Sequence, residues 1–312
     1  MTPGAPGRGP VLAVVGATAT GKSDMAVALA QRFDGEVVNA DSMQVYRGMD
    51  IGTAKLPVAQ RGGVPHHLLD VWDVRKAANV AEYQHLARSA IAGIHARGRL
   101  PILTGGSGLY VRAVLDELDF PGLDPVVRAR LTAELARVGA ATLHRRLADL
   151  DPAAAAAILP GNGRRIVRAL EVIETTGRPF TATLPELRRH YRHLTLGLAR
   201  PRAALDAAIA DRVDRMWAQG FVAEVAGLAD LPGSPTASRA LGYRQILTHL
   251  AGDTDEVTAR DETIRATRKF ARRQESWFRR DPTVVWLAAD DGDAVRHAQA
   301  AVEAFLPDAQ PA

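Results

Sequence analysis

The chain has 312 residues, of which 47% are hydrophobic and 24% are charged, a balance typical of folded globular proteins. No apolar run reaches the roughly 18 residues that suggest a membrane-spanning helix, and residues 1–10 lack the apolar core of a secretory signal. Cysteine is absent, which excludes disulfides, thiolate metal sites and a cysteine nucleophile. We expect a cytoplasmic protein with a disordered lead-in over residues 1–10 and a loose tail over 307–312.

Strands alternate with helices in the first third of the chain. Short apolar runs and helical periodicities predict, in order, a strand at 11–15, a helix from 22 to about 33, a strand at 36–40, a helix at 79–97 and a strand at 100–104. Asn79, followed three residues later by Glu82, is typical of the start of the second helix. This alternation indicates an α/β fold with a parallel, doubly wound sheet.

The pattern becomes purely helical in the middle of the chain. Helices are predicted at 124–138, 140–149, 152–158 and 164–176, and no convincing strand accompanies them. We therefore predict a helical insertion domain over 116–192, placed between two parts of one core, 11–115 and 193–306. The second part of the core is predicted to contain a strand at 194–198, helices at 202–219, 221–229, 238–250 and 256–279, and a last strand at 284–287.

Residues 16–23, GATATGKS, match the phosphate-loop pattern G-x-x-x-x-G-K-[ST] between a predicted strand and a predicted helix. In such a loop the backbone N–H groups and the helix N-terminus bind phosphate oxygens. Lys22 can reach the terminal phosphate, and Ser23 can bind Mg²⁺. We therefore predict a phosphate-loop NTPase-like core that binds a diphosphate or triphosphate through Gly16, Ala17, Thr18, Ala19, Thr20, Gly21, Lys22 and Ser23.

Two other segments follow predicted strands, so they should lie at the same sheet edge as the phosphate loop. Asp41 is equally well explained as a metal-binding or proton-accepting carboxylate and as the cap of a turn. The segment Gly105–Gly106–Ser107–Gly108 lets a ligand approach the backbone, although a tight strand-to-helix connection explains it better when it is taken alone.

The stretch 264–280 predicts a basic helix face. On a helix its cations fall within an arc of about 140°; they are Arg265, Arg268, Lys269, Arg272, Arg273, Arg279 and Arg280. Few acidic side chains interrupt them, so the stripe is expected not to be salt-bridged. Phe270 and Trp277 lie outside the arc and are expected to pack on the core. The net charge of +4 also permits an anionic partner, and contact with nucleic-acid phosphates is favoured over a merely solvated face.

Together these segments resemble the tRNA dimethylallyltransferases, also called tRNA isopentenyltransferases, in their bacterial form. The resemblance runs from Val11 to about Trp286, through GATATGKS (16–23), NADSMQVYRGMDIGTAK (39–55), PHHLLD (65–70), GGSGLY (105–110), RRIVRALEV (164–172), LGYRQ (241–245) and ATRKFARRQ (266–274). It implies transfer of a dimethylallyl group from dimethylallyl diphosphate to N6 of the adenine 3′ to the anticodon, in tRNAs that read codons beginning with U. It also implies a phosphate-loop α/β core with an inserted helical domain.

The resemblance implies roles for individual residues. Asp41 would be the general base, Ser107 would stand beside the reacting centre, and Arg239 would stabilise the departing diphosphate together with Mg²⁺. Contacts with tRNA would come from Asp41, Ser42, Met43, Gln44, Ser107, Arg128, Arg164, Arg165, Arg168, Arg268, Lys269 and Arg272. A monomer without membrane contact is expected, although no sequence feature fixes the oligomeric state.

Two other functions share part of this pattern. A small-molecule kinase using ATP would explain the phosphate loop and Asp41, but it leaves the basic helix without a role. A GTPase switch would need an N-K-x-D phrase, which the sequence lacks. A transfer assay that compares dimethylallyl diphosphate with ATP would separate these possibilities.

Overall fold

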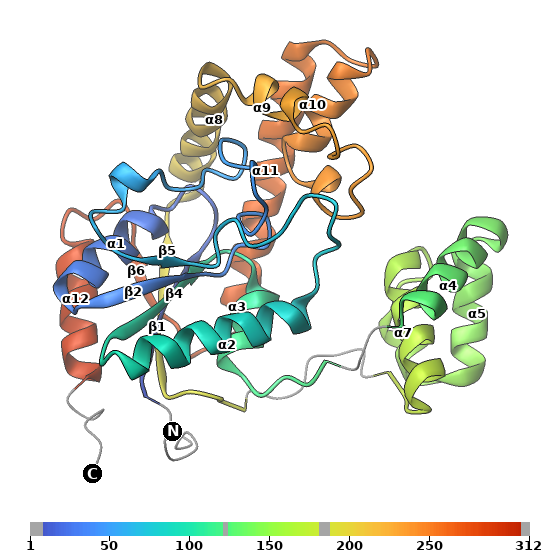
Figure 1. Ribbon diagram of the computed structural model, residues 1–312, viewed down its shortest axis with the longest axis horizontal. Coiled ribbons are helices and arrows are strands. Elements are labelled where there is room, and N and C mark those ends of the chain that lie inside the picture. The colour runs from blue at the N-terminus through green and yellow to red at the C-terminus, as the bar shows by residue number, and fades with distance from the viewer. Residues whose placement is uncertain (1–8, 121–123, 181–187, 307–312) are drawn as a thin grey trace. The chain divides into compact units, whose positions relative to one another are not determined.

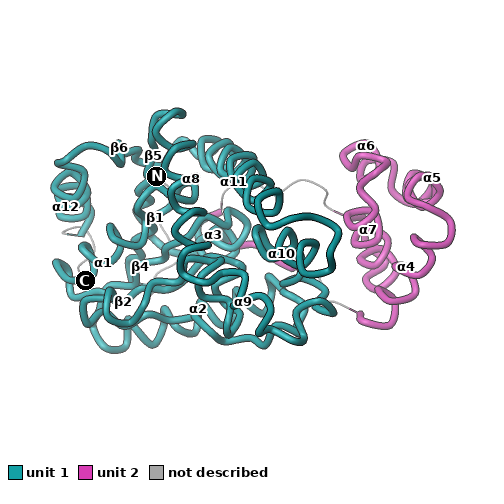
Figure 2. The backbone as a smooth tube through the Cα atoms, turned by 90° about the horizontal axis from the view of Figure 1, so that it is seen from above, with its two compact units in different colours: residues 1–116, 189–312 teal, residues 117–188 magenta. Residues whose placement is uncertain are grey.

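The computed structural model describes residues 9–120, 124–180 and 188–306 (Figure 1). The chain forms two compact units, one of residues 1–116 and 189–312 and one of residues 117–188 (Figure 2). Most of the expected lead-in and all of the expected tail lie outside the described residues. No described helix is long and apolar enough to cross a membrane.

Unit 1 is built on a six-stranded sheet in the order β3-β2-β4-β1-β5-β6, in which every neighbouring pair is parallel. The strands are β1 (Val11–Gly16), β2 (Gly35–Asn39), β3 (His66–His67), β4 (Leu100–Gly105), β5 (His193–Ala199) and β6 (Val285–Ala288). The central strand β1 is apolar and buried along its whole length because both of its faces are covered by other elements. The predicted α/β fold class is thus confirmed.

Alternate residues of β1 point into different cores. Leu12 and Val14 pack with α1 (Lys22–Arg32) and α12 (Ala294–Phe305). These two helices lie on one face of the sheet (Figure 1). Val11, Ala13 and Val15 belong to the larger core on the other face, together with α2 (Val80–Ala96) and α3 (Gly108–Leu115). The remaining helices of unit 1 are α8 (Arg202–Ala218), α9 (Phe221–Gly227), α10 (Tyr243–Leu250) and α11 (Glu256–Phe278), with short 3₁₀ turns η1 (Val58–Gln60) and η2 (Ala237–Arg239).

Most predicted elements of unit 1 are present, with three additions and one correction. The strand β3 and the helices α3 and α12 were not among the predicted elements. The single helix expected over 238–250 is instead η2 followed by α10. Gly242 separates them with a φ of 82°, a left-handed conformation that interrupts a right-handed helix.

The regular elements in the described part of unit 2 are all helices. It contains α4 (Pro125–Val138), α5 (Ala140–Leu150), α6 (Pro152–Ala157) and α7 (Gly163–Thr176) around a core of its own. Local sequence fixes several helix starts, because the side chains of Asp124, Asp151 and Asn162 accept hydrogen bonds from first-turn N–H groups. Residues 189–192, expected in the insertion, belong to unit 1, where the His190 N–H donates to the Leu115 carbonyl.

Candidate active site

The phosphate-loop segment connects β1 directly to α1. Its first residue, Gly16, has a φ of 142°, and a Cβ there would lie 2.5 Å from the Leu198 carbonyl oxygen on β5. Gly21 has a φ of 84° and precedes α1, and the Thr20 hydroxyl donates to the Ala17 carbonyl at 2.9 Å. No side chain caps α1. The N–H groups of its first turn are therefore left for a ligand, and the helix dipole favours an anion there.

Lys22 is folded back onto this loop. Its Nζ donates to the Ala17 carbonyl at 2.5 Å. Burial, and then the nearby Arg212 guanidinium, lower the pKa of Lys22 to about 7, while the Asp41 carboxylate acts in the opposite direction. The ammonium therefore lies among groups from three different elements, and an anion bound beside it would restore its charge.

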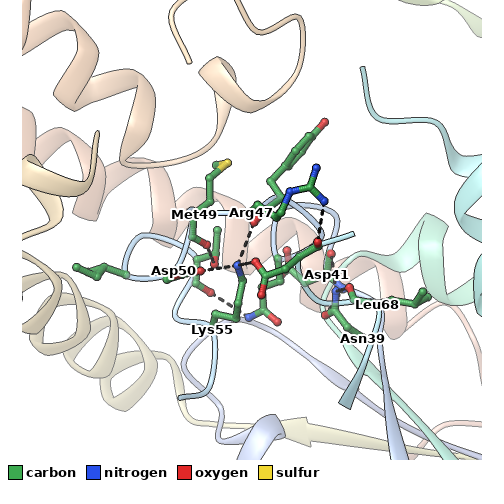
Figure 3. Close-up of polar contacts among 12 residues, drawn as sticks. Asn39, Asp41, Arg47, Met49, Asp50, Lys55 and Leu68 are labelled. Carbon is green, nitrogen blue, oxygen red and sulfur yellow. Dashed lines mark hydrogen bonds and ion pairs between the residues drawn. The ribbon is translucent and has the colours of Figure 1, made fainter. Parts of the chain in front are cut away.

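Asp41 stands just beyond the end of β2 and forms a turn. Its N–H donates to Asn39 Oδ1 at 3.0 Å (Figure 3). Its Oδ1 accepts from the Met43 N–H at 2.8 Å. The Asn39 amide also donates to the carbonyls of Asp41 and Leu68, both at 3.1 Å. Asp41 Oδ2 has no hydrogen bond within the described part of the chain. One oxygen thus caps a turn, and the other is free for chemistry.

A buried lysine stabilises the loop that follows Asp41. Lys55 Nζ donates to the Tyr46 carbonyl at 3.0 Å and to carboxylate oxygens of Asp50 and Asp70, each at 2.5 Å (Figure 3). The ammonium is almost fully buried, and these ion pairs compensate the cost of burying its charge. The network therefore fixes the loop 41–55 relative to the segment after β3.

A second anchor of the same loop comes from α9. The Glu224 carboxylate accepts from the backbone N–H groups of three successive residues, Asp50, Ile51 and Gly52, at 2.9, 2.6 and 3.2 Å. The Tyr243 hydroxyl donates to the same carboxylate at 2.6 Å. Neither residue was predicted as part of the site: Lys55 ends the phrase 39–55 but was given no role, and Glu224 lies in none of the phrases that carry the resemblance.

Ser107 joins the segment after β4 to the turn at Asp41. The Ser42 N–H donates to Ser107 Oγ at 3.1 Å, and the two hydroxyls are 3.2 Å apart. The neighbouring glycines are accounted for by close packing within the protein. A Cβ on Gly105 would lie 2.3 Å from backbone atoms of Ala40, and one on Gly108 would lie 2.1 Å from the Trp277 ring. The ends of β2 and β4 therefore meet as predicted, with Asp41 and Ser107 on adjacent segments.

Two helices from the far end of the chain complete this edge of the sheet. Leu205 and Ile209 of α8 and Ala271 of α11 pack on Ala17 of the phosphate loop. One turn beyond Ile209, Arg212 donates to the Thr53 carbonyl at 3.4 Å. Within the described ranges no carboxylate pairs with Arg212, and burial lowers its pKa although Asp41 acts against this. Arg212 was not predicted, because no local motif marks this position on α8.

Other predicted residues lie elsewhere. Arg239 is exposed on η2, and its guanidinium has no protein partner in the described chain. Four predicted arginines belong to unit 2. Arg128 and Arg168 pair with the buried Glu171, Arg168 at 3.0 Å, whereas Arg164 and Arg165 are exposed.

The basic stripe of α11 is only partly as expected. Its buried line is Ile264, Ala271, Gln274 and Phe278. Lys269 and Arg272 are exposed, but Arg268 donates to the Asp206 carbonyl at 3.0 Å and Arg279 pairs with Glu275 at 2.8 Å. The stripe is therefore partly salt-bridged, contrary to expectation, because Glu275 lies one helical turn before Arg279.

Phe270 and Trp277 were both expected to pack on the core, and only Phe270 departs from this expectation. Phe270 belongs to no described core cluster, and the Arg273 guanidinium lies 5.8 Å from its ring centre. Trp277 is partly buried and packs against the larger core, as predicted. Phe270 is next to Ala271 and so is turned by about 100° from the buried line, which places it on the flank of the helix.

Comparison with known proteins identifies the family. Residues 44–281 match the IPP transferase family. The chain belongs to this family. It is 63% identical over 298 residues to a tRNA dimethylallyltransferase of Salinispora arenicola, covering 95% of this chain and 87% of that protein. It is 64% identical over 299 residues to one of Thermobifida fusca, covering 94% of each chain.

Solved structures agree with this membership of the IPP transferase family. The structure resembles the full-length tRNA isopentenylpyrophosphate transferase of Bacillus halodurans, with a TM-score of 0.72 and 40% identity, over 96% of this chain and 98% of that one. It also resembles a eukaryotic dimethylallyltransferase acting on tRNA, with a TM-score of 0.84 and 26% identity, over 97% of this chain and 80% of that one. The resemblance inferred from the sequence is thus confirmed.

Proposed function

We propose that this protein transfers a dimethylallyl group from dimethylallyl diphosphate to N6 of the adenine 3′ to the anticodon, in tRNAs that read codons beginning with U. The observation that carries the proposal is the meeting of the phosphate loop, Asp41 and Ser107 at one sheet edge, in a chain that closely matches tRNA dimethylallyltransferases. A phosphate-binding loop beside a carboxylate with a free oxygen suits a reaction that releases diphosphate and a proton.

The reaction exchanges one bond for another. The N6 nitrogen of adenine forms a bond to the allylic carbon, the carbon–oxygen bond to diphosphate breaks, and diphosphate leaves with the electron pair. Asp41 Oδ2 takes the proton from N6, a role that suits the oxygen not used in the turn. The N–H groups at the start of α1, together with Lys22 and Arg212, stabilise the negative charge that grows on the diphosphate. Ser107 supports the Asp41 turn through Ser42, and Arg239 is expected to approach the diphosphate when substrate binds.

The residues at the start of α1 fit a Mg²⁺ ion held with the substrate. The Ser23 hydroxyl has no hydrogen-bond partner among the residues described, so it is available as a ligand. No group of three histidine, aspartate or glutamate side chains in the described chain forms a cage of its own. A single protein hydroxyl together with the substrate's phosphate oxygens suits Mg²⁺, which is usually bound by one or two protein oxygens and by substrate phosphates. The ion would supply positive charge to the leaving diphosphate.

The tRNA is proposed to contact basic side chains in both units, and also the loop that follows Asp41. In unit 1 these are Lys269 and Arg272 of α11, with Arg268 at their side, and the loop of Ser42, Met43 and Gln44 beside the site. In unit 2 they are Arg128, Arg164, Arg165 and Arg168. The target adenine must leave its stack to reach Asp41. The protein acts with its tRNA in the cytoplasm, as a monomer.

The proposed function is tested by offering tRNA together with labelled dimethylallyl diphosphate or labelled ATP. We expect label from dimethylallyl diphosphate in tRNA, without ATP, and loss of transfer in Lys22→Ala. A matched control is Lys76→Ala, which removes a half-exposed lysine that pairs with Glu82 away from the loop. An absolute need for ATP hydrolysis, with no prenyl transfer, would overturn the proposal in favour of a kinase.

A further inference from the structure

A buried glutamine on α11 joins two loops of the site. Gln274 is buried, with only 5% of its surface exposed. Its Oε1 accepts from the Thr18 N–H in the phosphate loop at 2.9 Å, and its Nε2 donates to the Gly106 carbonyl at 2.9 Å. The two loops follow β1 and β4, which are neighbours in the sheet. The amide therefore spans the gap between the ends of these strands.

The surrounding packing leaves little freedom at this contact. Ala271, one turn before Gln274, packs on Ala17 of the phosphate loop. A Cβ on Gly106 would lie 2.2 Å from the Gln274 Nε2, so only glycine lets the amide come this close. Gly106 does not have a positive φ, which means that its role here is to leave space for the side chain.

The chemistry of the side chain suits this position. A glutamine amide supplies a donor and an acceptor on one rigid planar group, and a glutamate or methionine of similar size cannot supply both. Because Gln274 takes the Thr18 N–H, this N–H is not free for phosphate, and the ligand is left with the N–H groups further along the loop. Gln274 thus selects which part of the loop can hold the diphosphate.

We propose that Gln274 is a positioning residue for dimethylallyl transfer, holding the phosphate loop at a fixed offset from the segment that carries Ser107. The proposal rests on the proposed function. It places the leaving group, bound by one loop, relative to Asp41, which is joined to the other loop through Ser42 and Ser107. Small errors in such an offset cost more in the chemical step than in the binding of either substrate.

The test separates position from stability. In Gln274→Met both hydrogen bonds are lost while the volume is kept. We expect kcat to fall about 10- to 100-fold, with KM for tRNA changed less than about twofold. Gln274→Glu keeps the acceptor for Thr18 but loses the donor to Gly106, and it adds a negative charge. It should lower kcat similarly and also raise KM for dimethylallyl diphosphate.

Two further variants sharpen the result. Thr263→Val is the matched control, because Thr263 is buried on the same helix and its hydroxyl donates only to the Ala259 carbonyl. It should lower the melting temperature but leave kcat unchanged. Gly106→Ala disturbs the same contact from the other side by displacing the amide, so it should reproduce the kcat loss of Gln274→Met.

Several outcomes would overturn the inference. A kcat for Gln274→Met within about twofold of the parent would do so, as would an equal loss of kcat in Thr263→Val, which would point to general loosening of α11. Calorimetric binding of inorganic diphosphate to parent and variants gives a readout without activity, and the affinity of Gln274→Met should differ from that of the parent. If the parent itself does not transfer dimethylallyl groups, the proposed function is wrong. In that case the role of Gln274 is still tested by diphosphate binding, and equal affinities of the parent and Gln274→Met would overturn it.

Discussion

The two carboxylate oxygens of Asp41 have different partners, and this difference sets what a substitution can reveal. Asn at this position can still accept from the Met43 N–H, so the turn should survive. It cannot take a proton from N6. We therefore expect Asp41→Asn to bind tRNA normally and to slow transfer by roughly 10²- to 10⁴-fold, the usual range for loss of a general base. Single-turnover kinetics and tRNA binding are the measurements. Normal chemistry with weakened tRNA binding would show that Asp41 only binds.

Lys22 gives the site a pH dependence of definite sign. Its pKa is lowered from 10.5 to about 7 in the free protein, and a bound diphosphate favours the charged form. Diphosphate should therefore bind with uptake of a proton above pH 7, and affinity should fall by up to about tenfold per pH unit until the pKa of the complex is reached. Calorimetry in buffers of different ionisation enthalpy measures this uptake.

Lys22→Arg is the control for this pH dependence, because arginine stays charged throughout the range. The titration of diphosphate itself is common to both proteins, so the difference between them reports Lys22. Equal proton uptake by parent and variant would contradict the assignment.

Sequence reasoning found the site residues that lie in contiguous phrases. The phosphate loop, Asp41 and Ser107 each follow a predicted strand, and parallel strands end at one edge, so their meeting could be deduced. Gln274 ends the phrase 266–274, but its role could not be found this way, because it lies 256 residues from its partner Thr18 and only the packing of α11 brings the two together. The same holds for Glu224, which lies more than 170 residues from the backbone N–H groups that it accepts from.

Helix α11 has one side that packs on the site and another that is exposed to solvent. One side packs on the phosphate loop through Ala271, and the exposed side carries Lys269 and Arg272. A hollow on the surface beside Arg272 is lined mostly by arginine side chains, those of Arg202, Arg272, Arg279 and Arg280, with Glu275 and Ser276. Such a surface suits phosphate groups, whose binding releases counterions.

Salt dependence tests this face of α11. Lys269→Ala and Arg272→Ala should each flatten the log–log slope of tRNA affinity against salt by about one unit, and they should weaken cognate and non-cognate tRNA alike. Arg296→Ala on α12 is the matched control, since it removes an exposed arginine paired with Asp293. Unchanged slopes in folded variants would mean that the face is merely solvated. A change confined to one tRNA would mean that these side chains read bases.

Hydrophobic periodicity predicted the helices that have one apolar face. It did not predict breaks that depend on the φ of a single residue, or strands too short to show a period. The helices of unit 2 were predicted with boundaries close to the observed ones, because capping residues precede three of them. The break at Gly242 was missed, since a single glycine within a helical pattern does not reveal its φ. The two residues of β3 are too few to show a period.

For the molecule as a whole, the insertion of unit 2 has a simple construction. In unit 1, Asp116 and Arg189 form an antiparallel bridge. In unit 2, the Glu117 N–H donates to the Arg188 carbonyl at 2.7 Å. The chain thus leaves unit 1 and returns to it at adjacent positions, as a hairpin would.

Replacing residues 118–187 by Asn-Gly should therefore close unit 1 with a two-residue turn. We expect the shortened protein to fold and to bind inorganic diphosphate like the parent. Its affinity for tRNA should fall by at least about tenfold, because the arginines of unit 2 are lost. Circular dichroism, calorimetry and filter binding measure the three properties. A shortened chain that unfolds would show that unit 1 depends on unit 2.

The two sides of α11 have a thermodynamic consequence. A polyanion bound at Lys269 would contact the exposed side of the helix, and a diphosphate bound by the phosphate loop would act on its other side through Gln274. If either ligand favours a particular setting of the helix, the other must gain or lose affinity by the same factor, whichever arrives first. The order in which the two ligands bind would then affect only the rates. The change in affinity that each causes in the other would be the same in either order, because both act through the same helix.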